Sequence, residues 1–229
     1  MNYFTSSPSR LIPFFCIFIS GAASLVYELI WIRQLSLVFG GTLYAISAVL
    51  CSFMTGLALG AWGIGLFLSY RNKQKKAVNL VLIYGIIEGF IGLYGLFFPY
   101  GLEFITQFYA PVVDGTIELG SLLHWIEFFL SAALMLPATI CMGATLPIIG
   151  SWSIGKNSER IVSDVSALYS LNTFGAVAGC LYTQTIALKY FGVNATNFTA
   201  IGMNFLVFFL CTPLQSYFKK KPSSKISVI

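Results

Sequence analysis

Long apolar runs separated by short polar segments set the pattern of this chain. The hydrocarbon core of a bilayer is about 30 Å thick, and a helix needs roughly 20 apolar residues to cross it. Six runs reach this length, and we place the predicted helices at residues 11–31, 42–69, 77–98, 121–150, 165–187 and 196–215. The second and fourth runs exceed a perpendicular crossing, so a tilt, a kink or an interfacial extension must absorb the excess. The pattern predicts an all-α polytopic integral membrane protein with about six transmembrane helices.

The composition also indicates a membrane environment. Of the 229 residues, 57% are hydrophobic and only 9% are charged, whereas charged residues make up about a quarter of a soluble domain. The five cysteines lie inside the apolar runs without a metal-type spacing, which indicates packing residues and predicts no metal and no other cofactor. The first run lacks a small-residue cleavage site, so we expect it to be a retained helix.

Positive charge falls in the connections between the runs. Cytoplasmic loops retain Lys and Arg, and a cytoplasmic N-terminus leaves only Arg33 and Lys189 of the thirteen basic residues outside. The predicted topology has both ends in the cytoplasm, with an N-terminal segment 1–10, a transmembrane domain 11–215 and a basic tail 216–229. The basic residues form short clusters and no continuous face, so nucleic acid is not an expected partner.

The longest outer connection of this topology covers residues 99–120. It carries acidic residues but no Lys or Arg, and it contains several aromatic side chains. We expect a short amphipathic piece that lies on the outer membrane interface.

Small residues predict where helices touch. Helix association in lipid uses glycines that let two backbones approach closely, as in the GxxxG pattern. One such pattern is Gly56 with Gly60, which we expect to extend through Gly63 and Gly65, and a second is Gly175 with Gly179. Packing within the chain is the favoured interpretation, and a homodimer seam is the alternative.

The fourth run contains helix breakers. Pro137 and Pro147, with Gly143 between them, predict a kinked or broken helix, because each proline removes a backbone hydrogen bond. Transporters place substrate sites at such breaks. A simple proline kink and a binding site are both open interpretations.

Ionisable residues inside the apolar runs are the candidate chemistry. A carboxylate near the membrane centre costs about 2.5–3.5 kcal/mol on insertion scales, so we expect each one to have a hydrogen-bonding partner or a function. Glu88 is the deepest, and we expect it to face the interior of the bundle. Glu28 and Glu127 lie in the outer half, and we expect them near one polar cavity that opens outward.

Partners for these carboxylates follow from helical spacing. His124 precedes Glu127 by three residues and can meet it, whereas Glu28 and Arg33 point in different directions and need interhelical partners such as Asn172. These residues are either structural hydrogen-bonding groups or a site for a cation or proton. One His among scattered Glu residues forms no metal ligand set, and no nucleophile and base pair is visible.

Three segments resemble the membrane part of bacterial proteins that fuse a transporter-like, major-facilitator-like region to a spermidine-synthase-like domain. The segment SGAASLVYELIWIRQLSLVFGGTLYAISAVLCSFMTGLALGAWGIG is similar to the opening helices of that family. PATICMGATLPII is similar to its Pro-Thr-Met-Gly-Ala-Thr-Pro segment, and ALYSLNTFGAVAGCLYTQTIALKYFG to its Tyr-Asn-Thr-Gly-Ala helix. The resemblance covers residues 19–192 and implies a multi-pass protein of the bacterial inner membrane.

The resemblance carries over a membrane signature but no catalysis. No strand-linked GxGxxG follows the sixth run, so we expect the synthase-like catalytic domain to be absent. The matching residues are Tyr27, Glu28, Trp31, Arg33, Gly56, Gly60, Gly143, Ala144, Thr145, Pro147, Tyr169, Asn172, Thr173, Gly175 and Gly179.

Two functions therefore compete at the level of the sequence. The first is a noncatalytic membrane subunit or anchor that docks a separate protein, for which basic surfaces at residues 71–76 and 219–225 are available. The alternative is a transport-like module that binds or moves a small cationic molecule such as a polyamine. A membrane-embedded enzyme that uses the Glu residues and His124 is a third and weaker hypothesis.

Overall fold

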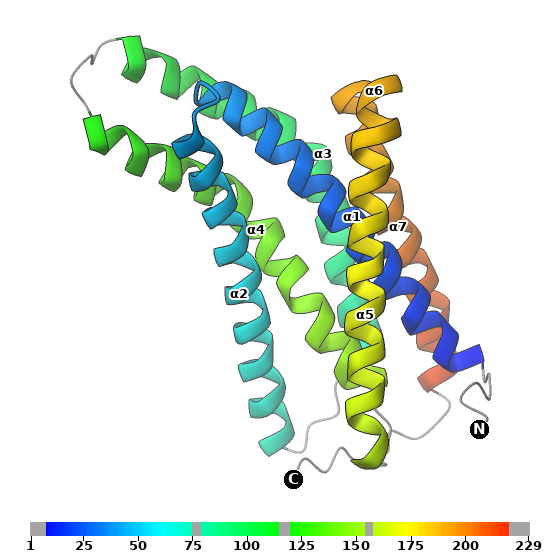
Figure 1. Ribbon diagram of the computed structural model, residues 1–229. Helices are drawn as coiled ribbons and strands as arrows, with labels where there is room; N and C mark the ends of the chain where they lie inside the picture. The colour runs from blue at the N-terminus through cyan, green and yellow to red at the C-terminus, as the bar shows by residue number, and fades with distance from the viewer. Residues whose placement is uncertain (1–7, 75–78, 115–119, 154–157, 220–229) are drawn as a thin grey trace.

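Helices make up nearly the whole of the described chain. The computed structural model describes residues 8–74, 79–114, 120–153 and 158–219. Figure 1 shows the helices, whose bounds are α1 Pro8–Val38, α2 Leu43–Lys73, α3 Leu80–Asp114, α4 Gly120–Ser153, α5 Ser158–Tyr182, a π-helical turn Thr183–Ala187, α6 Leu188–Tyr190 and α7 Gly192–Lys219. The all-α prediction is confirmed for these residues.

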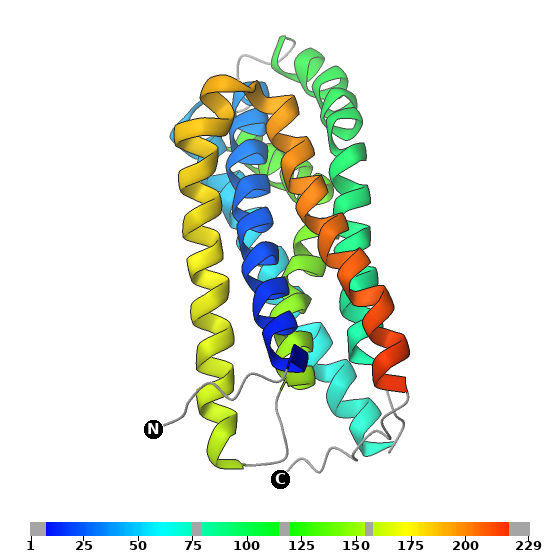
Figure 2. The ribbon, with the colours of Figure 1, turned by 90° about the vertical axis from the view of Figure 1, so that its right-hand side faces the viewer.

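The helices pack mainly in three pairs, α2 with α4, α1 with α5, and α3 with α7. Figure 2 shows α5, α1, α7 and α3 side by side. The N-terminal end of α7 lies between α1 and α3. The turn between α1 and α2 uses Gly40 and Gly41, whose φ angles of 87° and 70° favour glycine. The Thr42 hydroxyl then caps α2 by accepting a hydrogen bond from the Ala45 N–H at 3.1 Å.

Five helices are long and apolar enough to cross a membrane. They cover Ile12–Val38, Leu43–Lys73, Leu80–Pro111, Leu122–Trp152 and Gly192–Thr212. A polytopic membrane protein is therefore confirmed at the level of length and composition. The predicted run 165–187 is not among the five, because α5 is less apolar and a π-helical turn interrupts it.

The predicted outer connection at residues 99–120 is wrong over most of its length, since α3 continues to Asp114. Pro99 lies inside this helix and cannot donate the hydrogen bond that the Gly95 carbonyl would accept. The Asn197 side chain of α7 donates to that carbonyl instead, at 2.8 Å. This replacement lets the helix pass the proline.

Of the two predicted alternatives for α4, a kinked or a broken helix, the broken helix is wrong, because α4 is continuous through Pro137, Gly143 and Pro147. Figure 1 shows that α4 changes direction along its length, as a proline kink would require. The Tyr94 hydroxyl of α3 donates to the Leu134 carbonyl at 2.7 Å, next to the turn that Pro137 loosens.

The predicted glycine contacts form within the chain. A Cβ on Gly60 would overlap the Ile140 carbonyl of α4, and a Cβ on Gly175 would overlap the Phe18 carbonyl of α1. The same close approach holds for Gly56 against Thr139, Gly143 against Leu57, and Gly179 against Ala22. The predicted extension of the α2 contact was wrong, because no atom lies within 4 Å of a Cβ on Gly63 or Gly65.

Candidate functional site

The interior carboxylate of Glu88 joins three helices. Glu88 lies in α3 with 0% exposed surface, as the sequence analysis expected. The Ser20 hydroxyl of α1 donates to its Oε1 at 2.6 Å, and the Asn204 amide of α7 donates to its Oε2 at 2.7 Å. Each carboxylate oxygen thus accepts a hydrogen bond from a different helix.

Glycines on α3 bring α7 close enough for this contact. A Cβ on Gly92 would lie 3.2 Å from the Asn204 Cβ, and a Cβ on Gly85 would lie 2.9 Å from the Cys211 Cβ. Gly89 faces the Phe208 ring in the same way. The sequence analysis did not single out this third glycine row, although the spacing of Gly85 and Gly89 is that of a GxxxG pattern.

Within the described ranges no basic side chain pairs with Glu88. The one ion pair among the described residues joins His124 to Glu127. A buried carboxylate without a counter-ion loses several kcal/mol of hydration free energy, which two hydrogen bonds offset only in part. The arrangement therefore suits a carboxyl group that takes up a proton or a small cation.

Several buried polar atoms of α1, α3 and α7 have no hydrogen-bond partner among the residues that the structure describes. They are the hydroxyls of Tyr84 and Tyr27, the amide oxygens of Asn204 and Asn197, and the indole N–H of Trp31. All five side chains are buried, with at most 7% of their surface exposed. Such groups are rare in native structures, because each one forfeits the hydrogen bonds that water would make.

Glu127 forms a separate site in α4. It is 2% exposed, and the Tyr109 hydroxyl donates to its Oε1 at 2.8 Å. His124 Nδ1 lies 3.7 Å from Oε2, so the two side chains meet as their spacing predicted, but the distance is too long for a hydrogen bond. The His124 ring stacks on Tyr44, with centroids 4.3 Å apart.

The structure does not assemble the larger outer cluster that the sequence suggested. Glu28 is half-buried and forms no hydrogen bond or ion pair with any residue of the described ranges. Arg33 is exposed, and its side chain forms no ion pair in the same ranges. Asn172 packs against Gly21 on α1, which places it in the α1–α5 contact.

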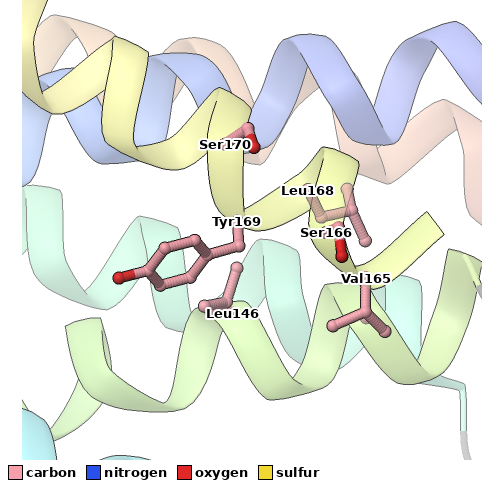
Figure 3. A pocket seen from close by; sticks show the side chains of 7 residues that line it. Leu146, Val165, Ser166, Leu168, Tyr169 and Ser170 are labelled. Atoms are coloured by element: carbon pink, nitrogen blue, oxygen red, sulfur yellow. The ribbon is translucent and has the colours of Figure 1, made fainter. Parts of the chain in front are cut away.

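A hollow of about 310 Å³ lies between α4 and α5 (Figure 3). Neither Glu88 nor Glu127 lines it. Its lining is mostly apolar, with two serine hydroxyls and one tyrosine, and it contains no charged side chain. The lining residues are Leu146, Gly150, Val165, Ser166, Leu168, Tyr169 and Ser170. Of the predicted signature residues only Tyr169 lines it, and none of the candidate ligand residues does.

Sequence reasoning missed Ser20 and Asn204, the two donors to Glu88. It considered ionisable residues first, although a polar amide inside an apolar run was visible at Asn204. Such amides are typical interhelical hydrogen-bonding groups in lipid.

Comparison with known proteins adds no relative, since no family model, curated protein or solved structure matches the chain.

Proposed function

We propose that the chain is a transport-like membrane module that binds a small monovalent cation, the proton included, at Glu88. The observation that carries the proposal is a fully buried carboxylate, held by hydrogen bonds from two other helices, with no basic partner in the described chain. A carboxylate at membrane depth is a functional-site hypothesis by default, because a hydrocarbon side chain would be far less costly there.

In this proposal six helices cross the membrane. Figure 2 shows α5 running beside α1 over the height of the bundle, and the helical path continues from Ser158 through the π-helical turn to Tyr190. The sixth crossing is α5 with this extension, and both ends of the chain lie in the cytoplasm. An impermeant thiol reagent on intact cells should then spare a cysteine at Lys73 and modify one at Asp114, and the reverse pattern would overturn the topology.

The enclosure of the site favours small cations over polyamines. Glu88, Ser20 and Asn204 are at most 3% exposed, so a ligand as long as a polyamine would require the helices to separate. A cation of one or two atoms can exchange with smaller movements. The polyamine ligand and the resemblance to spermidine-synthase-like proteins both stay predictions.

The competing function, an anchor that docks a separate protein, has weaker support. It rests on basic residues at 71–76 and 219–225, most of which lie outside the described residues. Arg71 is described, and its guanidinium lies 5.9 Å from the centroid of the Phe67 ring. That contact is what an interfacial arginine makes without any protein partner.

Carboxyl labelling tests the proposal. The apolar reagent dicyclohexylcarbodiimide adds to protonated carboxyl groups, and peptide mass spectrometry locates the adduct. We expect purified wild-type protein to be modified at Glu88, with less modification as the pH rises. Protection by NaCl, compared with choline chloride at equal ionic strength and pH, would identify a metal cation, and dependence on pH alone would identify a proton.

Two variants control the experiment. Glu88→Gln keeps the shape of the side chain, replaces one acceptor oxygen by an NH2 group, and should lose both the adduct and any cation dependence of the melting temperature. Glu127→Gln is the matched control, which should leave the labelling of Glu88 unchanged. An unmodified Glu88 at every pH, with identical melting curves for wild type and Glu88→Gln in every salt, would leave Glu88 as a structural group.

A further inference from the structure

The polar atoms without partners lie along one seam of the bundle, where α1, α3 and α7 meet. Gly92 and Gly95 of α3 mark two levels of this seam, about one turn apart. Asn204 faces Gly92, and the Tyr27 hydroxyl would lie 2.6 Å from a Cβ on Gly95. Asn197 reaches the same level, because its amide donates to the Gly95 carbonyl.

The aromatic rings continue the seam beyond Gly95. Trp31 lies one turn after Tyr27 on α1, and their ring centroids are 4.8 Å apart. Phe98 of α3 stacks on the Trp31 ring, with the ring centroids 4.2 Å apart. The unpaired groups therefore extend from Glu88 toward the end of the bundle where α6 joins α7 (Figure 1).

The distribution of these groups is one-sided. Within the described ranges, four of the five unpaired atoms on the seam belong to Asn204, Tyr27, Asn197 and Trp31, which lead away from Glu88 toward α6. On the other side, the Tyr84 hydroxyl is the one unpaired atom of the seam among the residues that the structure describes. Beyond it the side chains are apolar or thiols, among them Ile17, Val81 and Cys211.

We propose that this seam binds a single file of water molecules that connects Glu88 to the α6 end of the bundle. Buried water typically bridges polar groups that would otherwise be unsatisfied, and each molecule needs two to four partners. The levels from Glu88 to Gly95 span roughly 10 Å at 1.5 Å per residue, so about four hydrogen-bonded waters form the inner part of the file. The outer part continues from Gly95 past Trp31.

The file gives Glu88 a path for protons, and this part of the inference rests on the proposed function. Each transfer breaks one O–H bond and forms another between neighbouring waters, so one proton enters at the α6 end as one reaches a Glu88 oxygen. The Ser20 and Asn204 hydrogen bonds hold the carboxyl group at the inner end of the file. Access is from the α6 end only.

Radiolytic footprinting tests for the water directly. Short X-ray pulses convert bound water to hydroxyl radicals, which modify the side chains that touch it. We expect modification of Tyr27 and Trp31 in the wild-type protein, although neither side chain is exposed to bulk solvent. Met135 is equally buried, and its sulfur is more reactive toward radicals, so it is the internal control.

The outcomes separate this inference from the proposed function. Labelling of Tyr27 and Trp31 several-fold above Met135, with loss at Tyr27 in Asn197→Leu, supports the file. Labelling no higher than that of Met135 in the wild type overturns it, whatever the variant does. The footprinting experiment does not depend on the chemistry of Glu88. Radiolytic labelling of Tyr27 and Trp31 without carbodiimide labelling of Glu88 supports the water file and refutes the cation site. Carbodiimide labelling of Glu88 without radiolytic labelling of Tyr27 and Trp31 supports the cation site and refutes the water file.

Discussion

Two seams of this bundle use glycine in the same way but differ in what they enclose. On the α2–α4 seam Gly60 and Gly143 bring backbone against backbone, and Gly56 packs against the Thr139 side chain. The hydroxyls there are satisfied by carbonyls, as in Ser52, which donates to Ala48 at 2.8 Å. On the α1–α3–α7 seam glycines bring together side chains that hydrogen-bond across helices and others that have no partner.

The difference between the two seams distinguishes a purely structural contact, the α2–α4 seam, from the seam that contains the candidate site. Helices in lipid gain nothing from apolar burial against each other, so close backbone approach supplies their packing energy. A seam that has only this contact needs no further explanation. The polar seam carries groups that weaken simple packing, among them a buried carboxylate, and the proposed cation site rests on this difference.

The largest expected effect comes from a substitution that disrupts the α2–α4 seam. Gly60→Leu forces a side chain into the Ile140 carbonyl of α4, and we expect a loss of at least about 3 kcal/mol of stability or failure to fold. Thermal unfolding followed by size-exclusion chromatography measures it.

Gly63→Leu is the matched control on the same helix, since nothing lies within 4 Å of its Cβ. It should be neutral or gain up to about 1 kcal/mol of helix propensity. Equal stability of the two variants would refute the packing of α2 on α4. A folded Gly60→Leu monomer that has lost a dimer would instead identify a seam between two chains.

A smaller loss of stability is expected on the α1–α3–α7 seam, where Asn197 can be tested against Pro99. Asn197→Leu removes the donor to the Gly95 carbonyl and should cost about 1–3 kcal/mol, because a buried acceptor loses its partner. Pro99→Ala restores a backbone N–H to the same carbonyl. In that background Asn197→Leu should cost less, with a coupling of at least about 0.5 kcal/mol in a double-mutant cycle. Strict additivity would show that Asn197 does not compensate for the proline.

Hydrophobic pattern was sufficient for the helical class and for most helix positions. It failed at residues 99–114, where α3 continues through Pro99 in place of the predicted connection, and in α4 it left open a broken helix that is in fact continuous. At Gly95 the Asn197 side chain from another helix replaces the donor that Pro99 lacks. In α4 the Tyr94 hydroxyl of α3 donates to the Leu134 carbonyl, next to the Ala133 carbonyl that loses its donor to Pro137. Such tertiary partners are not visible in the local sequence.

The candidate site was predictable only in part. The cost of a buried charge identified Glu88, and helical spacing identified His124 with Glu127. The partners of Glu88 lie 68 and 116 residues away in the chain, and one sequence without relatives gives no distance information of that range. Glu28 has no hydrogen bond or ion pair within the described ranges, so its place beside an outward-opening polar cavity stays a prediction.

The smallest expected effect concerns the His124–Glu127 pair, which belongs to neither seam. The His124 side chain is 41% exposed and lies 3.7 Å from the carboxylate, whereas the Tyr109 hydroxyl donates to it at 2.8 Å. His124→Phe keeps the stacking on Tyr44 and removes only a solvent-screened contact, so the loss should stay below about 1 kcal/mol. Tyr109→Phe deprives a buried carboxylate oxygen of its donor and should cost about 1–3 kcal/mol. Denaturant unfolding of both variants under one condition checks the order, and a larger loss from His124→Phe would mean that the histidine, not the tyrosine, holds Glu127 in place.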